Sequence, residues 1–464
     1  MNNLTQVIAA VSTPPGKGGV AIIRMSGDGA FEIADKVFLP ISGKKFSTCA
    51  PRTQIYGHII EGGEIIDDVL ATRFPAPHSY TGEDTVEIGC HGGILVTRCV
   101  LEALLRQGAV MATAGEFTRR AFINGRLSLT EAEAISDLLE AKSREQIRLS
   151  GQNARDRLSE RIQNIRADLV SLMSSIYARI DYPDEDLGDF SDREVLSSLY
   201  NIKEDSQKLL DTYRTGRAIS EGVRTVICGK PNVGKSSLYN LLLGEDAAIV
   251  TDIEGTTRDV LERTLPLGRV MLRIADTAGI RERENMDVVE QIGINRSREM
   301  IQKSELLFAI FDISRPFDTE DQLILDTIAK IDAPKIALIN KCDLTSSFDA
   351  SKLSGIFDET IEISAKANEA ETVTRLSDIV NRLFTDERLV IGQDAVISSA
   401  RQHAALKRCI DFVSIAIESL ENGFSQDAAS SDIERALGAI SQLDGRAVSE
   451  EIVADIFSKF CVGK

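Results

Sequence analysis

The chain has 464 residues, 43% of them hydrophobic, and its 71 acidic against 53 basic residues give a formal net charge of −18. One hydrophobic core stops growing near ~250–300 residues, so this length excludes a single domain and predicts two or three. The acidic balance opposes nonspecific attraction to phosphate backbones, so an RNA substrate would need a local basic patch or a partner's surface.

The sequence shows no apolar run of the ~18 residues that a membrane span needs, and the first residues lack a signal-peptide pattern. Its seven cysteines form no CxxC pair, and an odd number argues against a disulfide framework. We therefore expect a soluble protein of the reducing cytoplasm.

In chain order, residues 1–118 mix short β-type runs (20–24, 68–74 and 85–88) with Gly and Pro punctuation, which predicts a compact α+β domain. Residues 119–215 are helical in pattern, with capping-box spacing at 128–131 and an interruption predicted at 181–189, where Pro183 and Gly188 occur. Residues 216–388 alternate strands and helices, as a parallel sheet requires.

Residues 389–464 are helical again, with a second capping-box spacing at 431–434 and a break predicted at 444–445. The fold class is therefore multidomain α/β. We expect a discontinuous helical domain, formed by 119–215 and 389–464, into which the α/β domain is inserted.

A phosphate-binding motif follows the predicted strand 225–228. Gly229 to Ser236 satisfies GxxxxGK[ST], in which glycines turn backbone amides toward phosphates, Lys235 reaches the β and γ groups, and Ser236 suits Mg²⁺. A chance glycine turn is the alternative for this motif taken alone.

Three further motifs occur in the order of a GTPase. A predicted strand at 270–275 ends in DTAG at 276–279, where Asp276 can hold Mg²⁺ through water and Gly279 can face the γ-phosphate. Another at 335–339 ends in NKCD, where Asp343 can accept hydrogen bonds from guanine N1 and N2. Ser364-Ala365-Lys366 completes a base-clamping loop, so the sequence predicts GTP hydrolysis.

With GTTRD at 255–259 and FCVGK at 460–464, these motifs resemble those of the MnmE (TrmE) family of bacterial tRNA-modification GTPases. PPGKGG at 14–19, YTGED at 80–84, HGG at 91–93 and GEFT at 115–118 are similar to the family's N-terminal domain. The resemblance implies a folate-binding-like N-terminal domain that forms a homodimer, and an inserted P-loop GTPase domain with a Ras-like sheet. The GTP-binding residues expected from motifs and resemblance together are Asn232, Val233, Gly234, Lys235, Ser236, Ser237, Thr251, Asp252, Ile253, Glu254, Gly255, Thr256, Thr257, Asp276, Thr277, Ala278, Gly279, Asn340, Lys341, Asp343, Ser364, Ala365 and Lys366.

Ile280 follows DTAG where many small GTPases carry a water-orienting glutamine, so other groups must orient water and neutralise charge. The family uses potassium, and the resemblance implies that Asn232, Thr251, Ile253 and Thr256 bind K⁺ while Ser236 and Thr257 bind Mg²⁺. Asn232 could instead belong to a turn-forming Pro-Asn pair. The family's catalytic glutamate aligns with Glu290, and because 280–289 is longer than the usual pattern, Glu282, Glu284 and Asp287 are alternatives.

The resemblance also implies that Arg24, Glu87, Arg126 and Lys464 bind 5-formyl-tetrahydrofolate or a related one-carbon folate. Arg126 stands where many relatives carry lysine. Without the resemblance, both arginines would be ordinary surface residues. Cys461 is a catalytic nucleophile if Lys464 stabilises its thiolate, and otherwise a small apolar residue on the last helix.

The function expected from this resemblance is GTP-driven addition of an aminomethyl-type group, carboxymethylaminomethyl or aminomethyl, to C5 of the wobble uridine of certain tRNAs. An FAD-dependent MnmG (GidA) partner, in a heterotetramer, would supply the redox chemistry. The alternative is a regulatory GTPase of RNA or ribosome assembly, which would need a basic RNA-binding appendage. A third possibility is the cytosolic G domain of a membrane transporter. The sequence excludes it, because it contains no membrane span.

Overall fold

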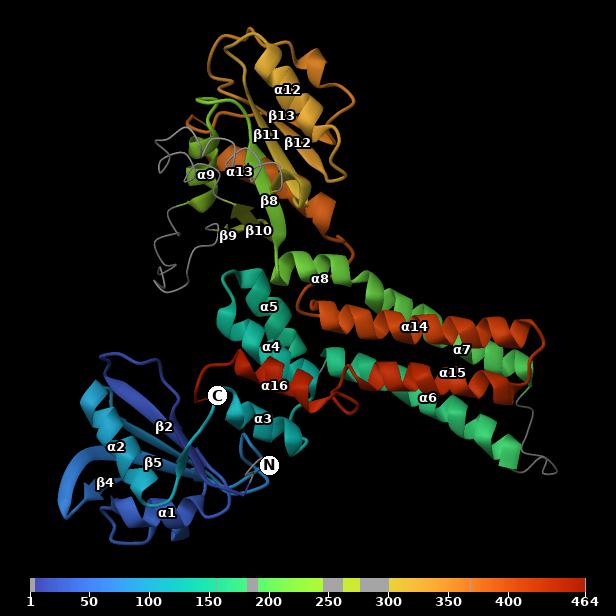
Figure 1. The fold of residues 1–464 in the computed structure, drawn as a ribbon. Coiled ribbons are helices and arrows are strands. Elements are labelled where there is room, and N and C mark those ends of the chain that lie inside the picture. The colour runs from blue at the N-terminus through green and yellow to red at the C-terminus, as the bar shows by residue number, and fades with distance from the viewer. Residues whose placement is uncertain are drawn as a thin grey trace, which may run out of the picture. The chain divides into compact units, whose positions relative to one another are not determined.

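The computed structural model describes residues 5–155, 157–181, 191–244, 262–275, 300–367 and 369–463 (Figure 1). The chain divides into two compact units. The first contains Met1–Leu139, Asn153–Ile202 and Asp411–Lys464, and the second contains Glu140–Gln152 and Lys203–Ile410. Each unit combines a sheet with helices, so the multidomain α/β fold is confirmed. We keep the domain boundaries after residues 118, 215 and 388 as a proposal.

The sheet of the first unit runs in the order β3-β4-β5-β6-β2-β1-β7. Its strands are β1 (Ile8–Val11), β2 (Val20–Ser26), β3 (Phe38–Pro40), β4 (Ile55–Glu61), β5 (Glu64–Phe74), β6 (Thr85–His91) and β7 (Val110–Met111), which confirms the three predicted strand runs. Side chains alternate between the faces of a sheet, and Ile23, Met25 and Ile88 join a core with α1 (Ala30–Val37) and α2 (Ile94–Arg106). The residues between them, including Arg24 and Glu87, therefore face away from this core.

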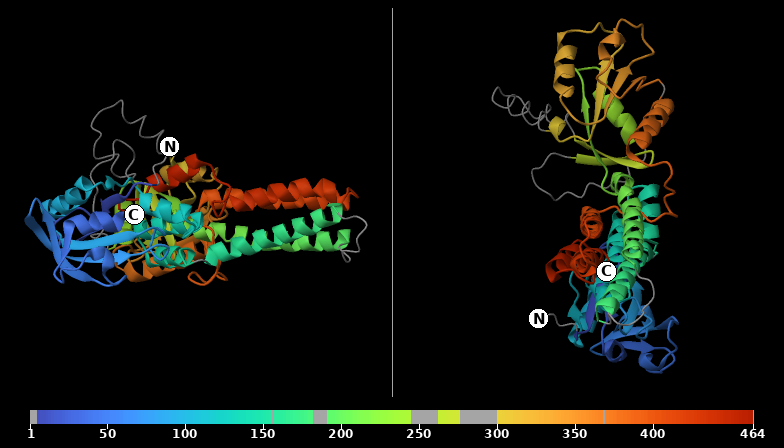
Figure 2. Two further views of the ribbon diagram at one scale, coloured as in Figure 1. Left: turned by 90° about the horizontal axis from the view of Figure 1, so that it is seen from below. Right: turned by 90° about the vertical axis from the view of Figure 1, so that its right-hand side faces the viewer.

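The helices of the first unit come from distant parts of the chain: α3 (Glu116–Ile123), α4 (Leu129–Glu140), α6 (Arg157–Asp181), α15 (Gln426–Ser441) and α16 (Glu450–Ser458). Leu129 of α4 packs against Val453 and Phe457 of α16. The long helices α6 and α15 lie side by side, as Figures 1 and 2 show. Two further helices, α7 (Asp192–Asp211) and α14 (Ala400–Glu421), have residues in both units.

One predicted helix start is confirmed and the other is wrong. Ser128 and Glu131 form the expected capping box, since each backbone N–H donates to the other's side chain at 2.5 and 3.2 Å. Residues 431–434 lie inside α15, whose N-cap is Ser425, with Oγ accepting from the Ala428 N–H. The pattern misled because Ser-x-x-Glu spacing also occurs within helices, where buried apolar residues such as Ile433 stabilise the helix.

The two predicted helix breaks agree with the helix ends. Helix α6 ends at Asp181 and α7 begins at Asp192. Helices α15 and α16 are separated by a segment in which Gly445 has φ 92°, a left-handed conformation that favours glycine. Within the described ranges, no helix is both long enough and apolar enough to span a membrane.

The sheet of the second unit runs in the order β13-β12-β11-β8-β10-β9. Its strands are β8 (Val223–Cys228), β9 (Glu262–Leu267), β10 (Val270–Ala275), β11 (Leu306–Asp312), β12 (Lys335–Asn340) and β13 (Glu359–Glu362). All neighbours pair in parallel except β9, which is antiparallel to β10. This is the Ras-like arrangement expected from the sequence.

Helices cover both faces of this second sheet. The core on one face includes residues of α9 (Lys235–Leu243) and α13 (Glu369–Phe384), and the core on the other includes residues of α12 (Thr319–Ile328). Helices α5 (Arg144–Asn153) and α8 (Tyr213–Ser220) pack with the segment around Val396. Ligands of parallel α/β sheets bind beyond the carboxyl ends of the strands, so the loops after β8, β11, β12 and β13 are where a site is expected.

Candidate functional sites

The phosphate-binding loop lies between β8 and α9. Gly229 has φ 150°, and a Cβ there would come within 2.5 Å of the Ile310 carbonyl oxygen, so only glycine fits. The Nζ of Lys235 donates to the carbonyls of Gly229 and Lys230 at 2.8 and 2.6 Å. These bonds hold the ammonium group at the N-terminus of α9, where helix amides and the helix dipole favour phosphate.

Lys230 has a role in this loop that the sequence did not reveal. Its side chain is buried, and its Nζ contacts Asp318 and Asp321 at 2.7 Å each. Those two carboxylates also form the capping box of α12. Burial lowers the pKa of Lys230, but the hydrogen bonds to both aspartates outweigh it and raise its pKa above the ordinary value. A charged Lys230 therefore ties the phosphate-binding loop to α12.

The NKCD and SAK motifs meet beside the phosphate-binding loop. Asn340 donates from Nδ2 to the carbonyl of Val233 at 2.8 Å and accepts the Ala365 N–H at Oδ1, at 3.1 Å. The Ser364 hydroxyl donates to Asp343 Oδ1 at 2.6 Å. Asn340 thus links all three segments, and Asp343 is held at the edge where a guanine base would contact it.

Lys341 joins the same site through Asp312, a buried carboxylate. Its Nζ donates to the Asn232 carbonyl at 3.1 Å and to Asp312, at the end of β11, at 2.5 Å. Burial raises the pKa of Asp312, but hydrogen bonds from Lys341 and Ser314 outweigh it, so its pKa lies below the usual range. Asp312 belongs to none of the nucleotide-binding motifs of the sequence.

The remaining nucleotide residues are partly described. Ser236 and Ser237 lie in the first turn of α9, with Ser236 exposed, and Lys366 is exposed in the loop after β13. Asn232 has φ 65° in an exposed turn, which fits the turn-forming interpretation and leaves its potassium role a prediction. The predicted site residues outside the described part of the chain are Thr251, Asp252, Ile253, Glu254, Gly255, Thr256, Thr257, Asp276, Thr277, Ala278, Gly279, Glu290 and Lys464, together with the alternatives Glu282, Glu284 and Asp287.

In the first unit, the structure pairs two of the proposed folate residues. Arg24 on β2 and Glu87 on β6 are direct cross-strand partners, and Arg24 Nε and Nη2 lie 3.0 and 2.8 Å from Glu87 Oε1. The guanidinium also lies over the rings of Tyr80 and Phe117, 5.1 and 5.7 Å from their centroids. Both contacts with Arg24 use Oε1, so they leave Glu87 Oε2 out of the pair with Arg24.

Glu87 and Arg126 line different cavities. Glu87 contributes to a cavity of about 460 Å³ on the open face of the sheet, with Tyr56, Thr72 and His91 among its lining residues. Arg126, which is exposed, contributes to one of about 640 Å³ with Ser128 and Arg446. Arg126 does pack near the loop after Tyr80, since a Cβ on Gly82 would lie 3.2 Å from its Cγ. The structure therefore brings Arg24 to Glu87 and leaves Arg126 apart from that pair.

The C-terminal tail, residues 459–463, is held against the first sheet. Cys461 is exposed and follows α16, so the alternative that placed it on the last helix is wrong. Val462 forms an antiparallel bridge with Ala114, the Gly115 N–H donates to the Cys461 carbonyl at 3.4 Å, and Ser12 Oγ donates to the Gly463 carbonyl at 2.9 Å. Burial raises the pKa of the Cys409 thiol to about 12, whereas Cys461 is accessible to solvent.

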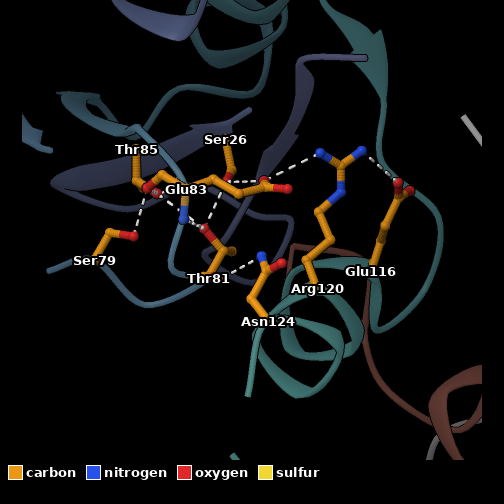
Figure 3. Close-up of polar contacts among 8 residues, drawn as sticks. All are labelled: Ser26, Ser79, Thr81, Glu83, Thr85, Glu116, Arg120 and Asn124. Carbon is orange, nitrogen blue, oxygen red and sulfur yellow. Dashed lines mark hydrogen bonds and ion pairs between the residues drawn. The ribbon is translucent and has the colours of Figure 1, made fainter. Parts of the chain in front are cut away.

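A buried arginine outside the predicted site residues lies beside the loop at 79–85 (Figure 3). Arg120 on α3 has no exposed side-chain surface and contacts Glu83 through Nη1 and Glu116 through Nη2, both at 3.1 Å. Ser26 Oγ donates to the same Glu83 carboxylate at 2.9 Å. Asn124 Nδ2 donates to the Thr81 carbonyl at 2.8 Å. A buried arginine has no local sequence signature, because its partners are brought to it by the fold.

The second unit has the architecture of a P-loop GTPase domain. Its phosphate-binding loop, its NKCD and SAK segments and the carboxyl ends of β8, β12 and β13 meet at one edge of a Ras-like sheet.

The chain belongs to the MnmE family of tRNA modification GTPases. Residues 129–461 match the MnmE helical domain, and residues 7–126 match the GTP-binding protein TrmE N-terminus. Proteins described as "tRNA modification GTPase MnmE" from Heliobacterium modesticaldum and Thermotoga petrophila are each 41% identical, over 98% of this chain and 99% of theirs. The protein of that description from Acetivibrio thermocellus is 39% identical over the same shares.

Proposed function

We propose that this chain hydrolyses GTP to drive addition of an aminomethyl-type group to C5 of the wobble uridine of certain tRNAs. The chain is a GTP-hydrolysing enzyme of tRNA modification, as its family membership indicates. The proposal for GTP rests on the two hydrogen bonds of the Asn340 side chain, one to the phosphate-binding loop and one to the SAK loop. They hold the residues expected to contact the phosphates next to those expected to contact the base.

The nucleotide site suits a metal-dependent phosphoryl transfer. Lys235 lies at the N-terminus of α9, and Ser236, the next residue, offers a hydroxyl for Mg²⁺. We further propose that Asn232 helps to bind K⁺, which would stabilise the charge that develops between the phosphates. Glu290 would orient the attacking water. Thr257 on Mg²⁺ and Thr251, Ile253 and Thr256 on K⁺ complete the proposed metal set.

The first unit would supply the one-carbon site. Arg24 and Glu87 form a fixed acid–base pair on the open face of the sheet, beside a cavity large enough for a pterin ring. We propose that 5-formyl-tetrahydrofolate or a related one-carbon folate binds there, with Arg126 and Lys464 meeting its other groups. Cys461, exposed in the tail that Ser12 and Gly115 hold, would act as the nucleophile.

Partners complete the proposed reaction. An FAD-dependent protein of the MnmG (GidA) type would supply the redox chemistry in a heterotetramer, and a homodimer would form through the N-terminal domain. The seven cysteines are all free thiols, which supports a cytoplasmic location. The formal net charge of −18 suggests that the partner supplies much of the basic surface that contacts tRNA.

The deciding experiment reconstitutes modification from purified components. The protein is incubated with unmodified tRNA, GTP, K⁺, a one-carbon folate and a nitrogen donor, with and without the FAD-dependent partner, and nucleosides are analysed by mass spectrometry. A new mass on the wobble uridine that requires both proteins is expected. No modified nucleoside, with GTP turnover intact, would favour a regulatory GTPase of RNA or ribosome assembly instead.

A further inference from the structure

The buried guanidinium of Arg120 connects two parts of the first unit that the proposed one-carbon chemistry needs together. It bridges two carboxylates, and its Nε has no hydrogen-bond partner among the described residues. A buried ionic cluster of one cation and two anions is weak evidence for stability, because desolvation offsets most of the attraction. The cluster is therefore better explained by the segments of the chain that its two carboxylates hold in place.

The Glu116 arm of the cluster leads to the tail. Glu116 Oε2 accepts the N–H and the hydroxyl of Thr113 at 2.8 and 3.0 Å, which fixes the turn at 113–116. That turn contains Ala114 and Gly115, the two residues whose backbones contact Val462 and Cys461. A Cβ on Gly115 would lie 2.4 Å from the Phe457 carbonyl oxygen, so the turn fits closely against α16.

The Glu83 arm leads to the strand that carries Arg24. Glu83 Oε2 accepts the hydroxyl of Ser26, which is two residues beyond Arg24 on β2, and Ser26 also contacts Thr81 at 2.7 Å. Ser26 thereby fastens the loop between Ser79 and Thr85 to the last residue of β2 (Figure 3). The guanidinium joins the two carboxylates directly, because Glu83 contacts Nη1 and Glu116 contacts Nη2. Two neutral bonds, from Asn124 to the Thr81 carbonyl and between Tyr80 and Thr118, also link this loop to α3.

We infer that Arg120 is a positioning residue, which fixes the Cys461 tail relative to the Arg24–Glu87 pair. This inference rests on the proposed one-carbon function. The planar fork of an arginine can reach two carboxylates at once, whereas the single ammonium group of a lysine cannot reproduce that geometry. Charge alone is therefore insufficient at this position.

The test compares variants of the full chain by hydrogen–deuterium exchange of the tail, residues 459–463, and of the turn at 113–116. Arg120→Lys and Glu116→Ala should each raise amide exchange in both segments by about 2- to 10-fold, the range for one lost hydrogen bond. Glu83→Ala should instead weaken binding of formyl-tetrahydrofolate, measured by calorimetry, and leave the exchange of the tail near the wild-type rate. Arg157→Lys is the matched control, since Arg157 forms an exposed pair with Glu160 on α6, outside the segments that are measured.

Peptides of α2 report whether a variant has lost its fold. Faster tail exchange with unchanged α2 exchange supports a positioning role, and Arg120→Lys matching the wild type in both tail exchange and folate affinity would overturn it. Wild-type protein that binds no formyl-tetrahydrofolate would refute the one-carbon function, and the exchange measurements would still test the contacts that hold the tail. Unchanged tail exchange in Glu116→Ala would overturn the inference whatever the folate result.

Discussion

The nucleotide site and the proposed one-carbon site are built in different ways. In the second unit, each of the described nucleotide-binding segments is a short loop that directly follows a strand. Much of the bonding in these loops uses backbone groups, as when Lys235 donates to the carbonyls of Gly229 and Lys230. In the first unit, the site depends on side chains that the sheet register aligns, and Arg24 and Glu87 are 63 residues apart. A site formed by backbone loops appears in the sequence as contiguous motifs. A site formed by the pairing of strands appears only as residues that are far apart in the sequence.

The largest effect should come from the glutamate that we propose to orient the attacking water in the nucleotide site. Glu290→Ala should slow GTP hydrolysis by ~10²–10⁴-fold in every alkali salt, the usual range for a positioned acid–base group. Single-turnover rates measure it, with Glu282→Ala and Glu284→Ala as matched variants on the same segment. A larger loss in either of those would move the role to that residue.

Potassium should have the next largest effect. Ile280 cannot orient water, and the motifs assign no arginine to the γ-phosphate, so another cation must supply the stabilisation that other GTPases obtain from arginine. Turnover should be ~10²–10³-fold faster in K⁺ than in Na⁺ at equal ionic strength, with Rb⁺ and NH₄⁺ substituting in part. Asn232→Ala should remove most of this difference and retain nucleotide binding through Lys235. Equal rates of wild-type turnover in the two salts would refute the potassium mechanism.

Much of the nucleotide-binding domain could be predicted because its motifs are local. The strands before Gly229 and Asn340 were predicted from short apolar runs, and the structure places their loops together with the loop at Ser364. Lys230 and Asp312 were not predicted, because their importance depends on partners such as Asp321 and Lys341 in other segments. The GTP-binding roles themselves stay predictions.

In the first unit, the sequence predicted strands but could not show their register. Alternation reveals which residues of β2 face the core, yet nothing local indicates that Arg24 lies opposite Glu87. Arg120 would be taken for a surface residue, because most arginines are exposed. The error at 431–434 has the same origin, since a local capping pattern was read without its tertiary context.

Replacing Asp343, the carboxylate proposed to recognise the base, tests the nucleotide site directly. Asp343→Asn should weaken GTP binding by about 5- to 150-fold, which corresponds to ~1–3 kcal/mol for a mismatched buried group, and should favour xanthosine triphosphate. The reason is that an amide can donate to O2 of xanthine, whereas guanine offers donors at N1 and N2. Competition binding with both nucleotides measures it. Unchanged preference for GTP would remove Asp343 from the base site.

Folate binding at the Arg24–Glu87 pair should not depend on the nucleotide site. Glu87→Gln and Arg24→Met should each weaken formyl-tetrahydrofolate binding about 10-fold or more, because a charge-assisted hydrogen bond is worth ~1.5–3 kcal/mol. Ser236→Ala, which changes only the proposed Mg²⁺ ligand, should bind folate as wild type does. Calorimetric titration of the three proteins decides it, and equal affinity in all three would exclude the proposed folate site.

The smallest effect concerns stability and pH, and it probes a buried carboxylate of the nucleotide site. The pKa of Asp312 is lowered in the folded protein, so the folded state favours its ionised form, and the resulting stability is fully present above the ordinary aspartate pKa of ~3.9. That stability is lost as the pH falls through the lower pKa of the folded state.

Asp312→Asn should therefore lower the free energy of unfolding by about 1 kcal/mol near pH 7, and the deficit relative to wild type should shrink steadily below about pH 4. Subtracting the unfolding free energy of the variant from that of the wild type removes the contribution of the other carboxylates. Lys341 supplies the physical reason for the sign, since its ammonium group contacts Asp312 directly. A stability difference that stays constant from pH 7 to pH 3 would mean that this ion pair does not set the pKa of Asp312.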